Sequence, residues 1–201
     1  MSKIKNLKHI YYERYSIDNI RYENYNLKNP NVKEKEYVLD DSDAVKNEKL
    51  AYIQVVYNNN PILYVTTPKM FCPFDLNKKG FTMNLQFTNY KTDPEMNGFF
   101  EFVKNIEFQQ MAHIGLDETN SDLYMSQIQY SKNDVYDPTL ILKLPFKYNK
   151  FEVDIYSDDF PLSVFNIRKY MNMTCDIYID KIWKFNDRFY CKWKVRNIFV
   201  H

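Results

Sequence analysis

Basic residues at every second position give the end of the chain its clearest chemical pattern. Side chains two residues apart lie on the same face of a β-strand. One face of such a strand would carry Arg188, Tyr190, Lys192, Lys194 and Arg196, and the other would carry Phe189, Cys191, Trp193 and Val195. The second set is fit for a hydrophobic core. The first set, four cations and a tyrosine, is fit to contact phosphates and to stack on an exposed base.

The charge distribution agrees with this pattern. The chain of 201 residues has a formal net charge of only +1. Residues 163–201 hold eight Lys or Arg against three Asp, a net charge of +5, whereas residues 117–160 hold four Lys against nine Asp or Glu, a net charge of −5. A nucleic-acid groove explains the basic region. A solvated strand whose lysines discourage edge-to-edge aggregation explains it equally well.

Further candidates for contact with a nucleic acid lie in the preceding strand and in the segment LKLPFK. Tyr190 is the best-placed aromatic for stacking, and the next candidates are Trp183, Phe185 and Phe146. The further cations for phosphate contacts are Lys184, Lys143 and Lys147. Other aromatic residues are assigned to the core, namely Trp193, Tyr64, Phe71 and Phe87.

A C-terminal hairpin would position these side chains. Met173–Lys184 has the pattern of one strand and Arg188–Val200 that of its partner. Asn186-Asp187 predicts the tight turn between them, since both residue types tolerate the left-handed conformation that two-residue hairpin loops require. The spacing of the isoleucines before Trp183 indicates a break after Asp180, and a β-bulge would invert the faces beyond it.

The preceding segments predict further strands and one helix. Ala51–Tyr57 and Ile62–Thr67 flank Asn58–Pro61, which predicts a hairpin. Phe81–Asn89 alternates as a half-buried strand does. Asp93-Pro94 predicts a helix start, with Asp as N-cap and Pro at the first helical position. Apolar residues then recur at helical spacing up to a stop at Gly115, and they are Met96, Phe99, Phe100, Phe102, Val103 and Ile106.

Short strands at Leu123–Tyr130, Thr139–Leu144 and Phe151–Tyr156 complete the pattern. Many short strands with one helix predict a mainly β fold, a small barrel or sandwich. Residues 1–48 lack a sustained period and are interpreted as an N-terminal arm with one strand near Glu36–Leu39, and residues 49–201 as the domain.

Composition and motifs argue against most enzyme classes. Cys72, Cys175 and Cys191 are widely spaced and distant in sequence from the three histidines, so no zinc site is predicted and the thiols are expected to be free. Three glycines cannot build a phosphate-binding loop, and no GxSxG motif is present. The carboxylates around Glu152 and Asp154 suit a solvated turn better than a metal nuclease. No cofactor, no metal and no membrane partner are expected, and the absence of a signal-like or membrane-spanning stretch favours a soluble intracellular protein.

Three segments of the chain resemble the single-stranded DNA-binding proteins of nucleocytoplasmic large DNA viruses, which are distantly similar to a phage replication protein of the same function. They are FFEFVKNIE at Phe99–Glu107, YDPTLILKLPFKYNKF at Tyr136–Phe151, and the closing stretch Cys175–Val200. The resemblance implies an OB-fold-like five-stranded barrel with additional strands and an inserted helix. It also implies a protein without catalytic residues that coats unwound DNA, without sequence specificity, during viral replication, recombination and repair.

Single-stranded DNA is therefore the expected partner. Viral replication proteins and further copies of the chain, in a homo-oligomer, are the other partners to consider, although the acidic tail that recruits partners in the phage proteins has no counterpart in Asn197–His201. The expected location is the viral factory in the host cytoplasm or the host nucleus. Two alternatives stay open: a non-enzymatic virion component such as a minor capsid or scaffold protein, and an RNA-binding module.

Overall fold

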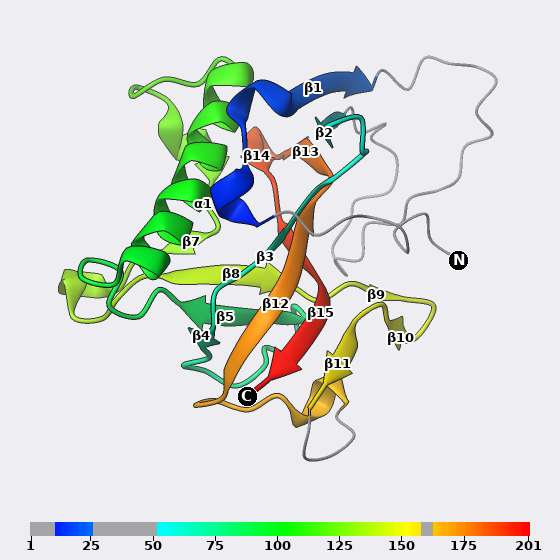
Figure 1. Ribbon diagram of the computed structural model, residues 1–201. Helices are drawn as coiled ribbons and strands as arrows, with labels where there is room; N and C mark the ends of the chain where they lie inside the picture. The colour runs from blue at the N-terminus through cyan, green and yellow to red at the C-terminus, as the bar shows by residue number, and fades with distance from the viewer. Residues whose placement is uncertain (1–10, 26–51, 158–162) are drawn as a thin grey trace.

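The computed structural model describes residues 11–25, 52–157 and 163–201 (Figure 1). Its centre is a closed β-barrel. The first barrel strand is formed by two collinear pieces, β3 and β4, which both pair with β12. The strands that close the barrel are β3 (Leu63–Thr66) with β4 (Met70–Phe71), β5 (Thr82–Gln86), β8 (Thr139–Lys143), β12 (Asn172–Ile179) and β15 (Trp193–Val200).

The pairing of these strands is that of an OB-fold. β4 pairs with β5, β5 with β8, and β15 with β12, all antiparallel. The parallel pair of β8 with β15 closes the ring. The chain is therefore mainly β, with a five-stranded OB-fold-like barrel, additional strands and one long helix, as the sequence predicted.

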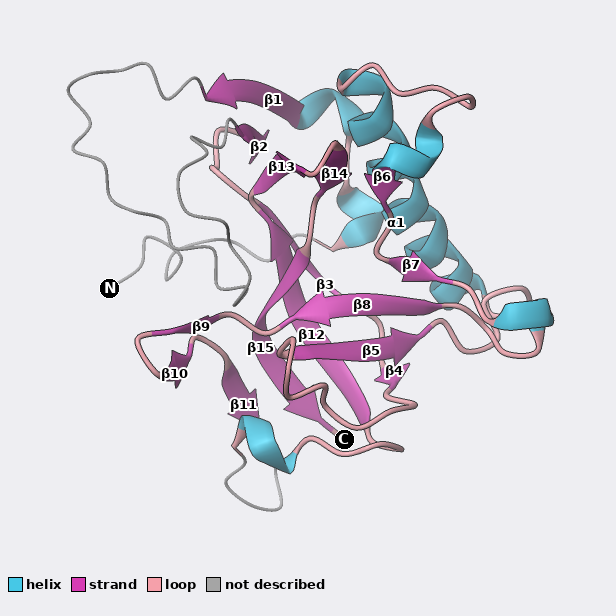
Figure 2. Cartoon of the chain, turned by 180° about the vertical axis from the view of Figure 1, so that it is seen from behind, coloured by secondary structure: helices cyan, strands magenta, loops and turns pink. Residues whose placement is uncertain are grey.

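A second sheet continues from the barrel. Its order is β1-β2-β13-β14-β6, and it stands above the barrel in Figures 1 and 2. β13 follows β12 after a single residue, and β14 leads into β15, so two barrel strands extend upward into this sheet. The members are β1 (Ile20–Tyr25), β2 (Tyr52–Tyr57), β6 (Tyr124–Met125), β13 (Lys181–Phe185) and β14 (Arg188–Tyr190).

Smaller elements decorate the barrel. β7 (Ile128–Gln129) pairs with β8, and β11 (Asp154–Tyr156) runs parallel to β15. β9 (Phe146–Lys147) and β10 (Lys150–Phe151) form a separate short hairpin. The 3-10 turns in the described residues are η2 (Tyr12–Arg14), η3 (Ile17–Asn19), η4 (Ser121–Leu123), η5 (Lys132–Asp134) and η6 (Val164–Asn166).

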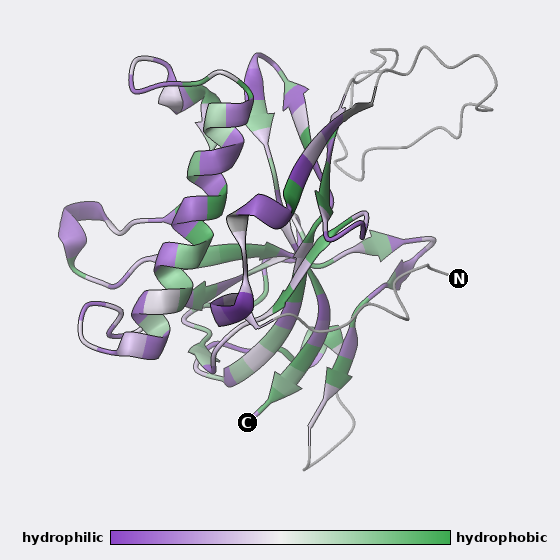
Figure 3. Cartoon of the chain, turned by 45° about the horizontal axis from the view of Figure 1, so that its top comes forward, coloured by the Kyte–Doolittle hydropathy of each residue, from purple (hydrophilic) through white to green (hydrophobic). Residues whose placement is uncertain are grey.

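The helix α1 (Pro94–His113) begins where the sequence predicted. The Asp93 side chain accepts hydrogen bonds from the backbone N–H groups of Glu95 and Met96, at 2.9 and 3.3 Å, and Pro94 is the first helical residue. Gly115, with φ of +77°, follows the last turn. Hydrophobic and hydrophilic residues alternate along the helix (Figure 3). Among the described residues, no helix has both the length and the apolar character of a membrane span.

The buried face of α1 packs on the barrel. Phe99 and Phe100 contact Phe87, with ring centroids 5.9 and 5.1 Å apart, and Phe102 lies 6.3 Å from Trp193. Trp193 is only 1% exposed, which confirms its assignment to the core. Burial of such aromatic surface is the main stabilising contribution of this interface.

The predicted hairpin around Asn58–Pro61 is only half right. Asn58 and Asn59 have positive φ and form the tight turn, which Tyr57 and Asn60 close with paired backbone hydrogen bonds. The flanking strands then diverge, because β2 pairs with β1 and β13 whereas β3 pairs with β12. A local turn signal says nothing about which distant strand each arm joins.

Two further differences concern strand length and the N-terminal residues. The predicted strand Leu123–Tyr130 is two short pieces in different sheets, because Ser126 and Gln127 turn the chain and bind the buried Glu107 carboxylate. Ile20–Tyr25, within the predicted arm, forms an edge strand on β2. The predicted strand Glu36–Leu39 and the boundary at residues 48 and 49 lie outside the described residues.

Candidate nucleic-acid interface

The hairpin of β13 and β14 forms as the sequence predicted. Trp183 pairs with Tyr190 and Phe185 with Arg188, and the two turn residues, Asn186 and Asp187, have φ of 46° and 61°. Two successive residues with positive φ match a type I′ turn, which follows the right-handed twist of the strands. The hairpin joins the fourth and fifth barrel strands, and this is one of the loops with which OB-folds bind oligonucleotides.

The outer face of this hairpin carries stacked aromatic rings. Trp183 and Tyr190 lie 5.7 Å apart with an interplanar angle of 18°. On the other side of Trp183, Tyr52 of β2 occupies the paired position. The row Tyr52–Trp183–Tyr190 thus crosses three neighbouring strands, and Trp183 and Tyr190 keep partial exposure.

Two lysines lie over this aromatic row. The Lys192 ammonium is 5.6 Å from the Trp183 ring centroid, and the Lys181 ammonium is 5.2 Å from that of Tyr52. Burial lowers the pKa of Lys181 below its usual value, although nearby Asp180 opposes this effect. We call Tyr52, Lys181, Trp183, Tyr190 and Lys192 the hairpin face.

Phe185 and Arg188 extend the hairpin face at its tip. They are paired in register next to the turn, and Arg188 is exposed. The Arg188 guanidinium lies 3.3 Å from the sulfur of Met125 on β6. Lys184, by contrast, is one residue out of phase with Trp183. It lies on the opposite side of the sheet, where it pairs with Asp187 at 2.9 Å and lies over Phe189. Lys184 is therefore not part of the hairpin face, and its predicted contact with a phosphate stays a prediction.

The alternating basic residues Arg188, Lys192, Lys194 and Arg196 do not form one continuous cationic surface. The alternation of core-facing and outward-facing side chains holds from Arg188 to Val195, but Lys194 and Arg196 are both in ion pairs. The Lys194 ammonium is 2.9 Å from the Asp180 carboxylate, and the Arg196 guanidinium is 3.3 Å from that of Asp154. A bend at Asp180 brings the first acid to β15, and the parallel strand β11 brings the second.

Arg196 also lies at a strand irregularity, which is distinct from the break predicted after Asp180. The register between β12 and β15 shifts between Asp176 and Ile177, which pair with Asn197 and Val195, so Arg196 is the extra residue of a bulge. Its guanidinium donates a further hydrogen bond, at 3.1 Å, to the carbonyl of Glu152. The Arg196 guanidinium is therefore held by both Asp154 and Glu152.

The candidates of the segment LKLPFK lie on and beside the barrel. Lys143 pairs in register with Lys194, and its ammonium donates to the carbonyl of Gly80 at 3.0 Å. Phe146 packs against Phe81 and Phe151, at 4.7 and 4.9 Å, so it supports the β9–β10 hairpin. Lys147 is exposed near the tip of that hairpin, 5.2 Å from the ring of Tyr148.

The described residues contain no cluster of His, Cys, Asp and Glu that could hold a metal ion. Of the predicted acidic turn, Asp154 is used by Arg196. Cys72, Cys175 and Cys191 are buried free thiols, and burial raises the pKa of all three, that of Cys72 to about 11. The prediction of free thiols is confirmed.

Two members of the hairpin face were missed by the sequence analysis. Lys181 is two residues before Trp183, so strand parity was a usable signal. Tyr52 had no such signal, because only the long-range pairing of β2 with β13 places it beside Trp183.

The solved structures that are similar to this chain include the crystal structure of gp2.5, a single-stranded DNA-binding protein encoded by bacteriophage T7. The match covers 69% of this chain and 86% of that chain, with 12% sequence identity and a TM-score of 0.46. No family model and no curated protein sequence matches the chain. The resemblance to the proteins of large DNA viruses stays a prediction.

Proposed function

We propose that this protein binds single-stranded DNA through the hairpin face. The observation that carries the proposal is the stack of Trp183 on Tyr190 with the Lys192 ammonium over the indole ring. Aromatic platforms beside cations bind single strands without reading their sequence, because every base has a stacking surface and every nucleotide a phosphate. The place of the hairpin between the fourth and fifth barrel strands supports the same function.

The biological role that we propose is non-enzymatic. The protein would coat unwound DNA during replication, recombination and repair of a DNA virus, in the viral factory or the nucleus of the host cell. A virion component of the same fold would have no use for an aromatic row with two lysines on one sheet face. The cations of this surface are Lys181 and Lys192, which lie over the aromatic row, and Arg188 at its tip.

Tryptophan emission tests the proposal directly, because the chain has two tryptophans in different environments. Trp193 is buried and Trp183 is partly exposed. In a Trp193→Phe variant, oligo-dT is expected to quench the emission of Trp183. In a Trp183→Phe variant, the emission of Trp193 is expected to stay unchanged on binding.

Fluorescence polarisation with labelled oligo-dT across a salt series gives the affinity. Trp183→Ala is expected to weaken binding about 5- to 150-fold, since one stacked base contributes about 1–3 kcal/mol. Phe108→Ala, which removes an aromatic ring that is 68% exposed on α1, serves as the matched control. Thermal melts show whether each variant is folded.

Absence of binding by the wild-type protein at low salt would refute the proposal and favour the virion component. Equal competition by duplex DNA would show that the surface reads only phosphate charge. Oligo-U as competitor distinguishes an RNA-binding protein from a DNA-binding one.

A further inference from the structure

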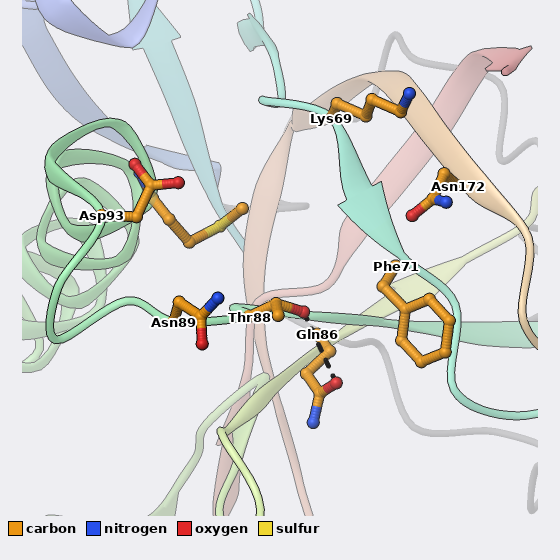
Figure 4. Close-up of a pocket in the computed structure, with 8 residues that line it drawn as sticks. Lys69, Phe71, Gln86, Thr88, Asn89, Asp93 and Asn172 are labelled. Carbon is orange, nitrogen blue, oxygen red and sulfur yellow. Dashed lines mark hydrogen bonds between the residues drawn. The ribbon is translucent and has the colours of Figure 1, made fainter.

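A groove of about 470 Å³ lies on the outside of the barrel, between β4, β5 and the start of α1. It is separate from the hairpin face, since the β13–β14 hairpin lies at the top of the molecule and β4 lies in its lower half in both views (Figures 1 and 2). Its walls combine one aromatic ring (Phe71), one lysine (Lys69), one carboxylate (Asp93) and one methionine (Met96) with uncharged polar side chains that include Gln86 and Asn172 (Figure 4).

Phe71 makes the aromatic wall, and a second ring extends it. Tyr170 stacks on Phe71 with centroids 6.0 Å apart and an interplanar angle of 20°. The Lys169 ammonium is 5.0 Å from the Tyr170 ring. Phe71, which was predicted to lie in the core, has a partly exposed side chain at the groove. The chain thus has a second stacked aromatic pair with a lysine beside it.

Tyr170 is fixed in an uncommon backbone conformation. Its φ is +73°, a value rarely adopted by a bulky residue. Its N–H donates to the carbonyl of Cys72 at 2.7 Å, and the N–H of Lys169 donates to the Asp75 carboxylate at 3.1 Å. These bonds hold the turn while the Tyr170 side chain remains 66% exposed. Glycine would adopt this backbone conformation with less strain than tyrosine.

The groove holds one cation, Lys69, and one carboxylate, Asp93. Lys69 is exposed and makes no ion pair or side-chain hydrogen bond with other described residues. The acid at the groove, Asp93, accepts the hydrogen bonds that cap α1. Gln86 and Asn172 carry amides, which can both donate to and accept from the edge of a base.

We propose that this groove holds one nucleotide of the bound single strand. It would be a second binding site for the same DNA, and this inference rests on the proposed function. The base would stack on Phe71 and Tyr170, with Gln86 and Asn172 at its edge, and Lys69 and Lys169 would contact the flanking phosphates. An extended peptide fits less well, because β4 is paired on both sides, with β12 and β5, and offers no free strand edge.

Photo-crosslinking of a long 5-iododeoxyuridine-substituted oligo-dT locates the stacked bases. Trypsin places the two sites in different peptides: the groove aromatics fall in Met70–Lys78 and Tyr170–Lys181, and the hairpin aromatics in Ile182–Lys184 and Phe189–Lys192. Crosslinks in at least one groove peptide, at Phe71 or Tyr170, are expected in addition to those in the hairpin peptides. Crosslinks confined to the hairpin peptides would overturn the groove proposal and leave the proposed function standing.

Tyr170→Gly provides the affinity test, because glycine tolerates positive φ and the variant should melt no lower than the wild type. Its affinity for the long oligo-dT is expected to fall about fivefold or more. Phe108→Ala is again the control. An unchanged affinity of Tyr170→Gly would refute the second site. If the wild-type protein binds no oligo-dT at low salt, the proposed function fails as well, a result distinct from binding that ignores Tyr170.

Discussion

Asp180 holds a cation away from the hairpin face, so its neutralisation is expected to strengthen DNA binding. Both Asp180 carboxylate oxygens lie 2.9 Å from the Lys194 ammonium. The two side chains are only 31% and 21% exposed. In Asp180→Asn the lysine keeps its place on the outer face of β15 but loses its anion. The fold should survive, because the backbone carbonyl of Asp180 still accepts the N–H of Val55 at 2.8 Å.

The size of the effect follows from one additional phosphate contact. A unit charge about 4 Å from a phosphate in water contributes about 1 kcal/mol, or roughly a fivefold gain in affinity. Each phosphate contact on a single strand adds about 0.7 to the slope of log K against log salt. A fourfold rise in salt therefore removes a factor of about 2.6 of the gain, and a gain of roughly twofold remains.

Polarisation titrations with oligo-dT at several salt concentrations measure both quantities. Asp187→Asn is the matched control, since it makes the same chemical change at the tip of the hairpin that Asp180 precedes, but it frees Lys184 on the opposite side of the sheet. It is expected to leave the salt slope unchanged. If both variants bind more tightly by the same factor, only net charge matters. If Asp180→Asn shows the wild-type slope, Lys194 does not reach the DNA and the reasoning is refuted.

Two further predictions concern stability and reactivity. Burial raises the pKa of Glu107 above the ordinary carboxyl value of about 4.5, although the hydrogen bonds from Ser126 and from the N–H of Gln127 oppose this effect. Above that ordinary value the folded state therefore binds more protons than the unfolded state, and the stability of the fold decreases as the pH rises through the raised pKa. Glu107→Gln should flatten this dependence in thermal melts recorded from acid to neutral pH; an unchanged pH profile would contradict the assignment. The three buried thiols should not react with a disulfide reagent at neutral pH while the protein is folded, and all three should react once it is unfolded. Rapid labelling of the folded protein would contradict this prediction and show that the core opens.

Local patterns predicted the elements that depend on neighbouring residues. Asp93-Pro94 placed the start of α1, and Asn186-Asp187 placed the hairpin turn, because caps and tight turns are settled by a few adjacent side chains. Strand parity also assigned Trp193 to the core, since alternation needs only an unbroken strand.

Properties that depend on distant residues could not be predicted in this way. The ion pair of Arg196 with Asp154 requires β11 to lie parallel to β15, a pairing with no local signal. The groove could not be predicted for the same reason. Phe71 and Tyr170 are about a hundred residues apart in the sequence, and they meet only through the pairing of β4 with β12. The sequence indicated which residue types could bind DNA, and the topology decided which of them are brought together.

The continuity of the barrel strands explains why the hairpin face can act as a rigid platform. β13 is flanked by β2 and β14, and β14 by β13 and β6, so neither strand of the hairpin has a free edge within the described residues. An isolated hairpin would be marginally stable in water. Here, the backbone that carries Trp183 and Tyr190 is already ordered in the folded protein, so that DNA binding would not require the free energy of ordering it. At the proposed site, the energy of stacking would then contribute to affinity without first having to order the loop.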